Sequence, residues 1–321
     1  MKNKSIYYSV GPLLYCPANK TTIANHLIEE KFGKDYSLAL CLEDTINDKF
    51  VVEAENQLAN SLFTLSSALD KRDFFMPKLF IRVRNPEQIN LLFDKLGRAG
   101  DLVTGIIIPK FSLENADVYI EALNKLNNKC TIRKYLMPIY ESASIVDKRI
   151  RIDDLYRLKE KLDFIDEDIL NIRVGGNDLC HLFGFRRNAD ESIHQIKPIS
   201  DIFTDIITVY GRDYVISGPV WEYYSGDGWD SGLAAEIKDD KLCGFIGKTV
   251  IHPNQIAVVN EAYKVSRQNY NDAKDILSWD FDNPSFVAGS FEKQRMNEFK
   301  THSNWALETV FLADHYGIRE D

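Results

Sequence analysis

Two acidic residues, Glu141 and Asp178, each follow a short apolar run, in the segments YLMPIYES and LNIRVGGNDL. Runs of this kind are typical of buried parallel strands, whose carboxyl ends gather at one end of a barrel. Two carboxylates there can share a hard divalent cation, and Mg²⁺ suits one or two carboxylates completed by water and substrate oxygens. Gly175-Gly176 would let the backbone approach the ion closely. Alternatively, the glycines only form a turn and Asp178 caps the next helix.

Acidic and basic residues also lie at the ends of three apolar runs that come earlier in the chain. Glu43 and Asp44 end LALCLED, Arg82 lies in KLFIRVRN, and Lys110 ends VTGIIIPK. We expect Arg82 to clamp a carboxylate, because its planar fork binds both oxygens, and we rank Arg84 lower because it points to the opposite face or lies beyond the strand. Glu43 could orient Arg82 or a metal-bound water, although such pairs are also common structural bridges. We expect Lys110 to bind an anion rather than form an imine, since nothing marks it as desolvated.

A histidine and a pair in the tail complete the candidates. His252, in GFIGKTVIHPNQ, could act as an acid or base, or it could simply open a helix, with Pro253 at the first helical position. In RMNEFKTHSNWA, Glu298 and His302 stand at an i, i+4 spacing. On one helix face they would suit a lid's catalytic pair or an ordinary surface pair.

These residues must be positioned by eight short apolar, β-branched runs that alternate with longer helical patterns. Eight such units favour a closed (β/α)8 TIM barrel over a doubly wound sheet, which usually has five or six strands. The near-continuous apolar character is that of parallel strands covered by helices. The runs are 13–16, 38–42, 79–83, 104–108, 135–139, 171–174, 214–217 and 249–251.

Helical signals fill the intervening segments. Residues 47–69 repeat apolar side chains at spacings of three and four, and Asn85 and Ser112 are N-cap candidates for the helices after the third and fourth runs. We assign residues 1–278 to the barrel and 279–321 to a C-terminal helical extension or lid. A helix over 291–316 carries large apolar residues, so it must pack on its own barrel or on a neighbouring subunit.

Composition narrows the class of protein. The chain has 321 residues, 45% hydrophobic and 27% charged, with a net charge of −9, which argues against broad binding to nucleic acid or anionic membrane. Its five cysteines form no CxxC pair and indicate reduced, buried thiols. The amino-terminal apolar run is short and broken by Gly11-Pro12, and no stretch approaches the length of a membrane span, so we expect a cytoplasmic protein.

Seven segments, taken in order, resemble the blocks of the citrate lyase beta-subunit-like lyases of the HpcH/HpaI aldolase superfamily. The tail, VAGS…RMNE…H..WA, is similar to a divergent branch described as TIM-barrel carbon–carbon bond lyases. The segments are LLYCPAN, LALCLED, FIRVRN, IIIPK, MPIYES, RVGGNDL and GFIGKTVIHPNQ.

The resemblance implies carbon–carbon bond cleavage or formation on a hydroxy acid or its acyl thioester, with Mg²⁺ holding a 2-oxo acid. It matches Glu141 and Asp178 to the metal ligands, Arg82 to the substrate-carboxylate arginine and Glu43 to the acidic residue behind it. Related lyases are trimers or trimer pairs, which implies a homo-oligomer. The family's first-strand arginine is missing from the stretch at residues 8–11, and this departure puts coenzyme A or another acyl carrier in doubt.

Two functions follow from these residues. The first is a Mg²⁺-dependent lyase that yields a 2-oxo acid product by retro-aldol cleavage. The second is a non-catalytic subunit that binds metal and 2-oxo acid and derives from such a lyase. The complete set of arginine and carboxylates favours the first, whereas the altered thioester end and the unusual tail keep the second open.

Overall fold

The computed structural model describes residues 2–282 and 284–320 and contains a sheet of eight parallel strands in the order β7-β6-β5-β4-β3-β2-β1-β8. A bridge between Gly218 and Lys248 joins the two edge strands and brings the sheet close to a full barrel. The predicted TIM barrel is thus confirmed, and each predicted run overlaps a strand. The strands are β1 (Pro12–Pro17), β2 (Ser37–Cys41), β3 (Lys78–Arg82), β4 (Val103–Ile108), β5 (Tyr135–Tyr140), β6 (Ile172–Val174), β7 (Ile216–Ser217) and β8 (Lys248–Val250).

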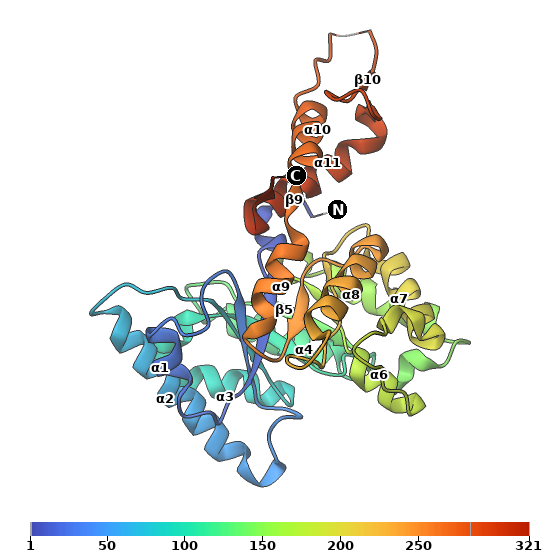
Figure 1. Cartoon of the computed structure of the whole chain (residues 1–321). Coiled ribbons are helices and arrows are strands. Elements are labelled where there is room, and N and C mark those ends of the chain that lie inside the picture. The colour runs from blue at the N-terminus through green and yellow to red at the C-terminus, as the bar shows by residue number, and fades with distance from the viewer. Residues whose placement is uncertain (1, 283, 321) are drawn as a thin grey trace.

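Helices connect the strands and cover the outside of the barrel (Figure 1). The α-helices are α1 (Ile23–Ile28), α2 (Val51–Leu69), α3 (Pro86–Leu96), α4 (Ala116–Asn127), α5 (Arg151–Asp163), α6 (Gly176–Phe183), α7 (Lys197–Tyr210), α8 (Trp229–Cys243) and α9 (Asn254–Tyr263). Short 3-10 helices lie at η1 (Ser5–Tyr8), η2 (Asp48–Phe50), η3 (Gly97–Leu102), η4 (Ala143–Val146), η5 (Asp166–Asp168) and η6 (Ile193–Gln195).

Two predicted helix starts had different outcomes. Asn85 caps α3 as expected, because its side chain accepts a hydrogen bond from the N–H of Gln88. Ser112 does not cap α4, which begins at Ala116. Instead, the N–H of Ser112 donates to the side chain of Asn115 (2.9 Å), so the prediction placed this helix start about one turn too early.

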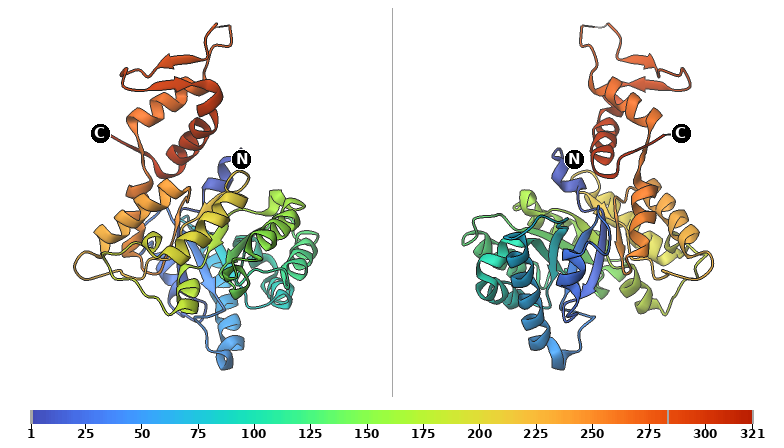
Figure 2. Two further views of the ribbon diagram at one scale, coloured as in Figure 1. Left: turned by 90° about the vertical axis from the view of Figure 1, so that its right-hand side faces the viewer. Right: turned by 60° about the vertical axis from the view of Figure 1, so that its left-hand side comes forward.

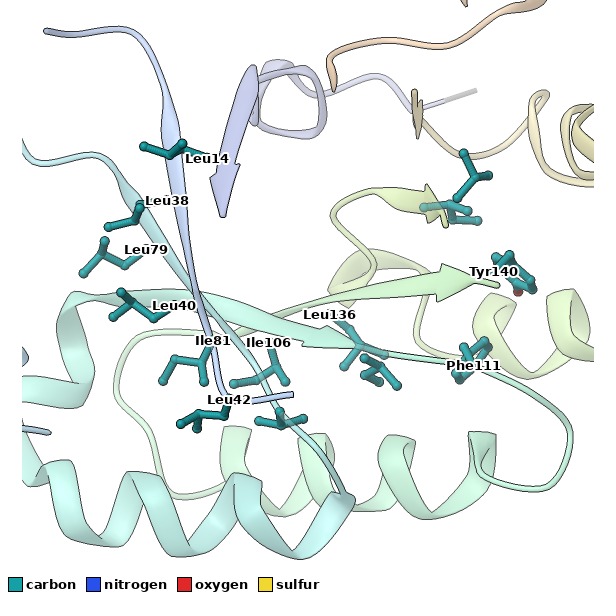
Figure 3. Close-up of a cluster of buried hydrophobic side chains, with 14 of the residues drawn as sticks. Leu14, Leu38, Leu40, Leu42, Leu79, Ile81, Ile106, Phe111, Leu136 and Tyr140 are labelled. Carbon is teal, nitrogen blue, oxygen red and sulfur yellow. The ribbon is translucent and has the colours of Figure 1, made fainter. Parts of the chain in front are cut away.

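The core has two layers. The larger fills the space between strands and surrounding helices, and Figure 3 shows some of its side chains on β1 to β5. The smaller lies inside the barrel and includes Leu13, Phe80 and Met137.

The thiols of Cys16, Cys41 and Cys180 are buried and free, but Cys243 is exposed, contrary to the expectation of buried cysteines. No described helix, within 2–282 and 284–320, is both long enough and apolar enough to span a bilayer.

A C-terminal extension projects from the barrel beside the amino terminus (Figures 1 and 2). It comprises β9 (Val265–Ser266), α10 (Arg267–Leu277), β10 (Val287–Gly289), β11 (Met296–Glu298), α11 (Phe299–Tyr316) and β12 (Ile318–Arg319). The predicted helix over 291–316 is therefore too long: its first part forms a hairpin, in which β11 pairs with β10. Helix α10, assigned to the barrel by the boundary at residue 278, packs against α11 through Ala273, Ile276 and Ala306.

The extension lies at the amino-terminal end of the barrel strands of the same chain. The Tyr316 ring stacks on Tyr263 with centroids 5.0 Å apart. Its hydroxyl lies against Gly247, just before β8. Phe311 packs on Tyr8, with ring centroids 5.1 Å apart. The extension therefore covers the floor of its own barrel, opposite the strand ends that carry Glu141 and Asp178.

Candidate active site

Arg82 holds three carboxylates together at the carboxyl end of β3. Its Nη2 atom lies 2.8 Å from Oε2 of Glu43, 3.2 Å from Oδ2 of Asp44 and 3.1 Å from Oε1 of Glu141. Arg82 and Glu43 are each only 7% exposed. All three contacts are made by this one nitrogen, and Nε of Arg82 has no hydrogen-bond partner in the described part of the chain. The predicted pairing of Glu43 with Arg82 is thus present.

Lys110 joins the same cluster from the end of β4. Its Nζ lies 2.7 Å from Glu43 and 3.1 Å from Asp44, and its backbone N–H donates to Oε1 of Glu141 (3.1 Å). Partial burial disfavours its charge, but the two carboxylates outweigh that effect and raise the pKa of Lys110 above its ordinary value. A lysine held charged in this way is a poor amine nucleophile, which disfavours imine formation.

Glu141 is left with one free oxygen. Its Oε1 accepts both hydrogen bonds described above, while no donor among residues 2–282 and 284–320 contacts Oε2. Burial raises the pKa of Glu141 to about 8; Arg82 lowers the value and Asp178 raises it. Gly175 makes room for the side chain, because a Cβ at this position would lie 2.1 Å from Oε2. Only glycine fits here without displacing the carboxylate.

Asp178 and Glu141 line the same cavity, of about 250 Å³. Asp178 is the third residue of α6, and its side chain makes no capping hydrogen bond to that helix, contrary to the alternative reading of the sequence. Two carboxylates that line one cavity, with Oε2 of Glu141 and the Asp178 side chain free of donors from the described part of the chain, fit a hard cation such as Mg²⁺. No group of three His, Cys, Asp or Glu in the described part of the chain could hold an ion, so water and ligand oxygens would complete the shell.

Among the cavity residues that were not predicted from the sequence are Tyr15, Arg173 and Thr249. Arg173 lies in the middle of β6, and its Nη2 donates to Oγ1 of Thr249 (2.5 Å). Tyr15 lies between the two arginines, with its ring centroid 5.9 Å from Cζ of Arg82. The sequence did contain a signal for Arg173, because it is a charged residue inside the apolar run NIRV. The same feature identified Arg82 in KLFIRVRN.

The remaining candidates lie outside this cluster. His252 does not line the cavity: its ring stacks on Tyr224 and its Nδ1 accepts from the N–H of Asn254 (3.2 Å), as in the helix-entry alternative. Glu298 and His302 belong to the extension. The pair does not share a helix face, because Glu298 precedes α11 and its backbone N–H donates to Nδ1 of His302 (3.0 Å).

Arg84 is also outside the cavity, in line with its lower rank. Its Nη1 donates to the carbonyl oxygens of Leu42 (3.3 Å) and Ile46 (3.1 Å), and its Nη2 pairs with Asp48. The side chain therefore ties the segment after β2 to β3 and leaves Arg82 as the arginine of this strand that reaches the site.

A second buried charge cluster lies between β8 and α8. The Lys248 ammonium is fully buried, 2.9 Å from Glu236 and 2.6 Å from Asp240. Arg187 also pairs with Glu236 (3.1 Å), and His194 contacts Asp240 (2.7 Å). These residues bind one another and line none of the site cavity, so they fasten a helix to the barrel.

Comparisons with known proteins agree with the barrel fold. The family described as C–C bond lyases of the TIM-barrel fold matches residues 4–318. A citrate lyase from Burkholderia xenovorans has a TM-score of 0.70 at 13% identity, covering 97% of this chain and 94% of the other. CitE from Mycobacterium tuberculosis, in complex with magnesium, acetoacetate and coenzyme A, has a TM-score of 0.61 at 18% identity, covering 97% and 99%.

The citrate lyase beta subunit of M. tuberculosis, complexed with oxaloacetate and magnesium, has a TM-score of 0.53 at 18% identity, covering 81% of this chain and 99% of the other. Among curated proteins no relative matches. The structural likenesses show a shared fold, and the family match spans nearly the whole sequence. The chain belongs to the family of C–C bond lyases of the TIM-barrel fold.

Proposed function

We propose that this lyase is Mg²⁺-dependent and acts on a hydroxy acid, or its thioester, to give a 2-oxo acid. The observation that carries the proposal is the donor-free Oε2 of Glu141, which lies in one cavity with the carboxylate of Asp178. The M. tuberculosis structures, which contain magnesium with oxaloacetate or acetoacetate, support the assignment by analogy.

The chain's own residues would prepare the site. Arg82 and the N–H of Lys110 fix Oε1 of Glu141, so that its other oxygen is available to the ion. Bound Mg²⁺ would supply a Lewis acid that stabilises charge on the 2-oxo acid oxygens. Lys110 is not among the residues that line the cavity, but it pairs with Asp44, which is, and its charge would help to attract an anionic ligand.

The proposal makes Arg82 a positioning residue as well as a carboxylate clamp. Three protein carboxylates already contact Nη2, so its first effect is to neutralise and orient them. A ligand carboxylate would approach a guanidinium that is already fixed in place, which reduces the entropy lost on binding.

Calorimetry with MgCl₂, in the presence and absence of pyruvate, tests the metal assignment. Glu141→Gln and Asp178→Asn should each abolish Mg²⁺-dependent pyruvate binding, whereas Glu121→Gln, on the exposed face of α4, should bind as the unchanged protein does. Normal binding by both site variants would contradict the proposal.

A turnover assay separates a lyase from a binding subunit. A lyase would release 2-oxo acid from at least one of a panel of hydroxy acids and their coenzyme A thioesters, whereas a binding subunit would bind without turnover.

A further inference from the structure

Arg173 is a buried cation without an acidic partner. It is 1% exposed, and its hydrogen-bond acceptors are neutral: Oγ1 of Thr249 at 2.5 Å from Nη2 and Oδ1 of Asn171 at 3.3 Å from Nη1. Within 2–282 and 284–320, no carboxylate lies at ion-pair distance from its guanidinium. Burial lowers the pKa of Arg173, and only the tyrosines Tyr15 and Tyr316 oppose that effect.

Other buried cations of the barrel are compensated. Arg82 contacts three carboxylates and Lys248 contacts two. Lys134 also lacks an acid, but its ammonium donates to the carbonyl oxygens of Gly100, Asp101 and Val103. Arg173 has five N–H donors and lines an open cavity instead. An unpaired buried charge is costly, so the position is explained if an anion binds there.

The residues that line the cavity fall into two sets of different charge, which we call the acidic wall and the basic wall. The acidic wall consists of Glu141, Asp178 and Asp44 together with Arg82, so it is net acidic and suits a cation. The basic wall consists of Arg173 on β6 and Thr249 on β8, with Tyr15 on β1 near both arginines, so it has donors and a positive charge. A ligand that spans both walls needs a metal-binding group at one end and an anionic group at the other.

We propose that Arg173, with Thr249 beside it, binds a second carboxylate of the ligand, so that the site selects a small diacid over a monoacid. The inference rests on the proposed function, because that function places the 2-oxo acid group on the acidic wall. The cavity of about 250 Å³ accommodates an acid of a few carbons, and it is smaller than a pocket that encloses a drug-sized molecule, roughly 300 Å³ or more.

Matched ligands test this inference by calorimetry at saturating MgCl₂. Oxaloacetate is compared with 2-oxobutyrate, and 2-oxoglutarate with 2-oxovalerate, because each pair exchanges the second carboxylate for a methyl group. At least one diacid should bind about tenfold or more tightly than its partner, as expected for charge-assisted hydrogen bonds. Arg173→Met should remove this preference and leave monoacid affinity within about twofold.

Controls separate recognition from a structural role. Arg84→Met, outside the cavity, should keep the preference, and Arg173→Lys should restore part of it because the charge returns. If Arg173→Met does not fold, the lysine variant and Thr249→Val carry the test, and both should reduce the preference. Equal loss of diacid and monoacid binding would show a structural role and overturn the inference.

The two proposals fail differently. Metal-dependent binding of 2-oxobutyrate with no preference for either diacid would overturn the role of Arg173 and leave the proposed function intact. If no 2-oxo acid binds in a Mg²⁺-dependent way, the proposed function fails. In that case succinate and butyrate, compared by thermal shift without metal, decide whether Arg173 binds a carboxylate on its own: succinate should stabilise the protein more, and only when Arg173 is present.

Discussion

A methyl group on Gly175 would lie 2.1 Å from Oε2 of Glu141, so the backbone after β6 and the carboxylate after β5 occupy adjoining space with no room to spare. The neighbouring position is also tight, since a Cβ at Gly176 would lie 2.6 Å from Ile193 and 2.9 Å from Pro219. The two glycines therefore serve different contacts, one with the site and one with the apolar core.

Gly175→Ala should impair the site more than the fold. Its φ of −95° is open to alanine, so the strain falls on the Glu141 side chain rather than on the backbone. We expect Mg²⁺-dependent pyruvate binding to fall by at least about tenfold. Calorimetry measures the binding, and circular dichroism checks the fold. Unchanged metal affinity in the alanine variant would show that Glu141 does not need this space.

Arg82→Lys keeps the charge but loses the planar fork. All three carboxylates contact one nitrogen, Nη2, so lysine would lose the remaining guanidinium donors, among them Nε, which has no partner in the described part of the chain. We expect 2-oxo acid binding to weaken by about 1.5–3 kcal/mol, the range for hydrogen bonds to charged groups. Titration of pyruvate at saturating MgCl₂ measures the change. An unchanged affinity would mean that Arg82 neither orients the carboxylates nor contacts the ligand.

Tyr263 and Tyr316 stack on each other but use their hydroxyls differently. Tyr263 donates to the carbonyl oxygens of Phe245 and Gly247, both at 3.2 Å, whereas the buried Tyr316 hydroxyl has no hydrogen-bond partner among the residues that the structure describes. Tyr263→Phe should lower the free energy of unfolding by about 1 kcal/mol. Tyr316→Phe should leave it unchanged or raise it. Urea unfolding of the two variants measures both values, and equal losses would refute the distinction.

Lys248→Met should be among the more damaging single changes in the barrel. It would leave Glu236 and Asp240 buried with less compensation, and removing one partner of a buried pair costs about 3–5 kcal/mol. Lys129→Met is the matched control, because Lys129 pairs with Asp94 at 3.0 Å on the surface, where such pairs contribute about 0–1 kcal/mol. Denaturant unfolding of both variants at one pH makes the comparison. A small effect of Lys248→Met would show that the cluster relaxes or takes up water.

Glu308, on α11, should make the stability of the protein depend on pH. Burial raises its pKa above the ordinary value, and no donor in the described chain contacts its carboxylate. The folded protein therefore favours the neutral form of Glu308. The contribution of this group to the free energy of unfolding is fully present below its unfolded pKa of about 4.3 and is lost as pH rises through its folded pKa. Glu308→Gln should be more stable than the unchanged protein at pH 8 and similar at pH 4.

Urea unfolding from pH 4 to pH 8 measures this difference. Glu261→Gln is the control: Glu261 is exposed and pairs with Lys264 at 2.6 Å, so its removal should not stabilise the protein at high pH. A Glu308→Gln variant whose stability runs parallel to that of the unchanged protein over this range would refute the prediction.

The strands were predictable because their determinants are local. Near-continuous apolar runs with β-branched residues identify buried parallel strands, and the structure shifts their ends by only one or two residues, as in β7 (Ile216–Ser217) against 214–217. The hairpin of β10 and β11 was missed because its pairing depends on contacts between segments. Its turn contains Lys293 at a φ of +55°, which no sequence pattern indicated.

The acidic wall of the site was predictable for a topological reason. Parallel strands in a barrel bring their carboxyl ends together, so Glu43, Arg82 and Glu141 had to approach one another. Arg173 was not predicted because the prediction considered residues at the ends of strands. Arg173 lies in the middle of β6 and reaches the cavity from there. His252 could not be excluded, because a histidine at a strand end and a helix-entry histidine look alike in sequence.

Ser5 and His315 are 310 residues apart in the sequence, yet Oγ of one lies 2.8 Å from Nε2 of the other. The floor of the barrel is thus sealed by segments from its two extremes. During synthesis the barrel strands are complete before α11 emerges, so the contact between η1 and α11 belongs to the late steps of folding. Destabilising it should lengthen the life of an open intermediate while leaving the early pairing of β1 to β5 unaffected.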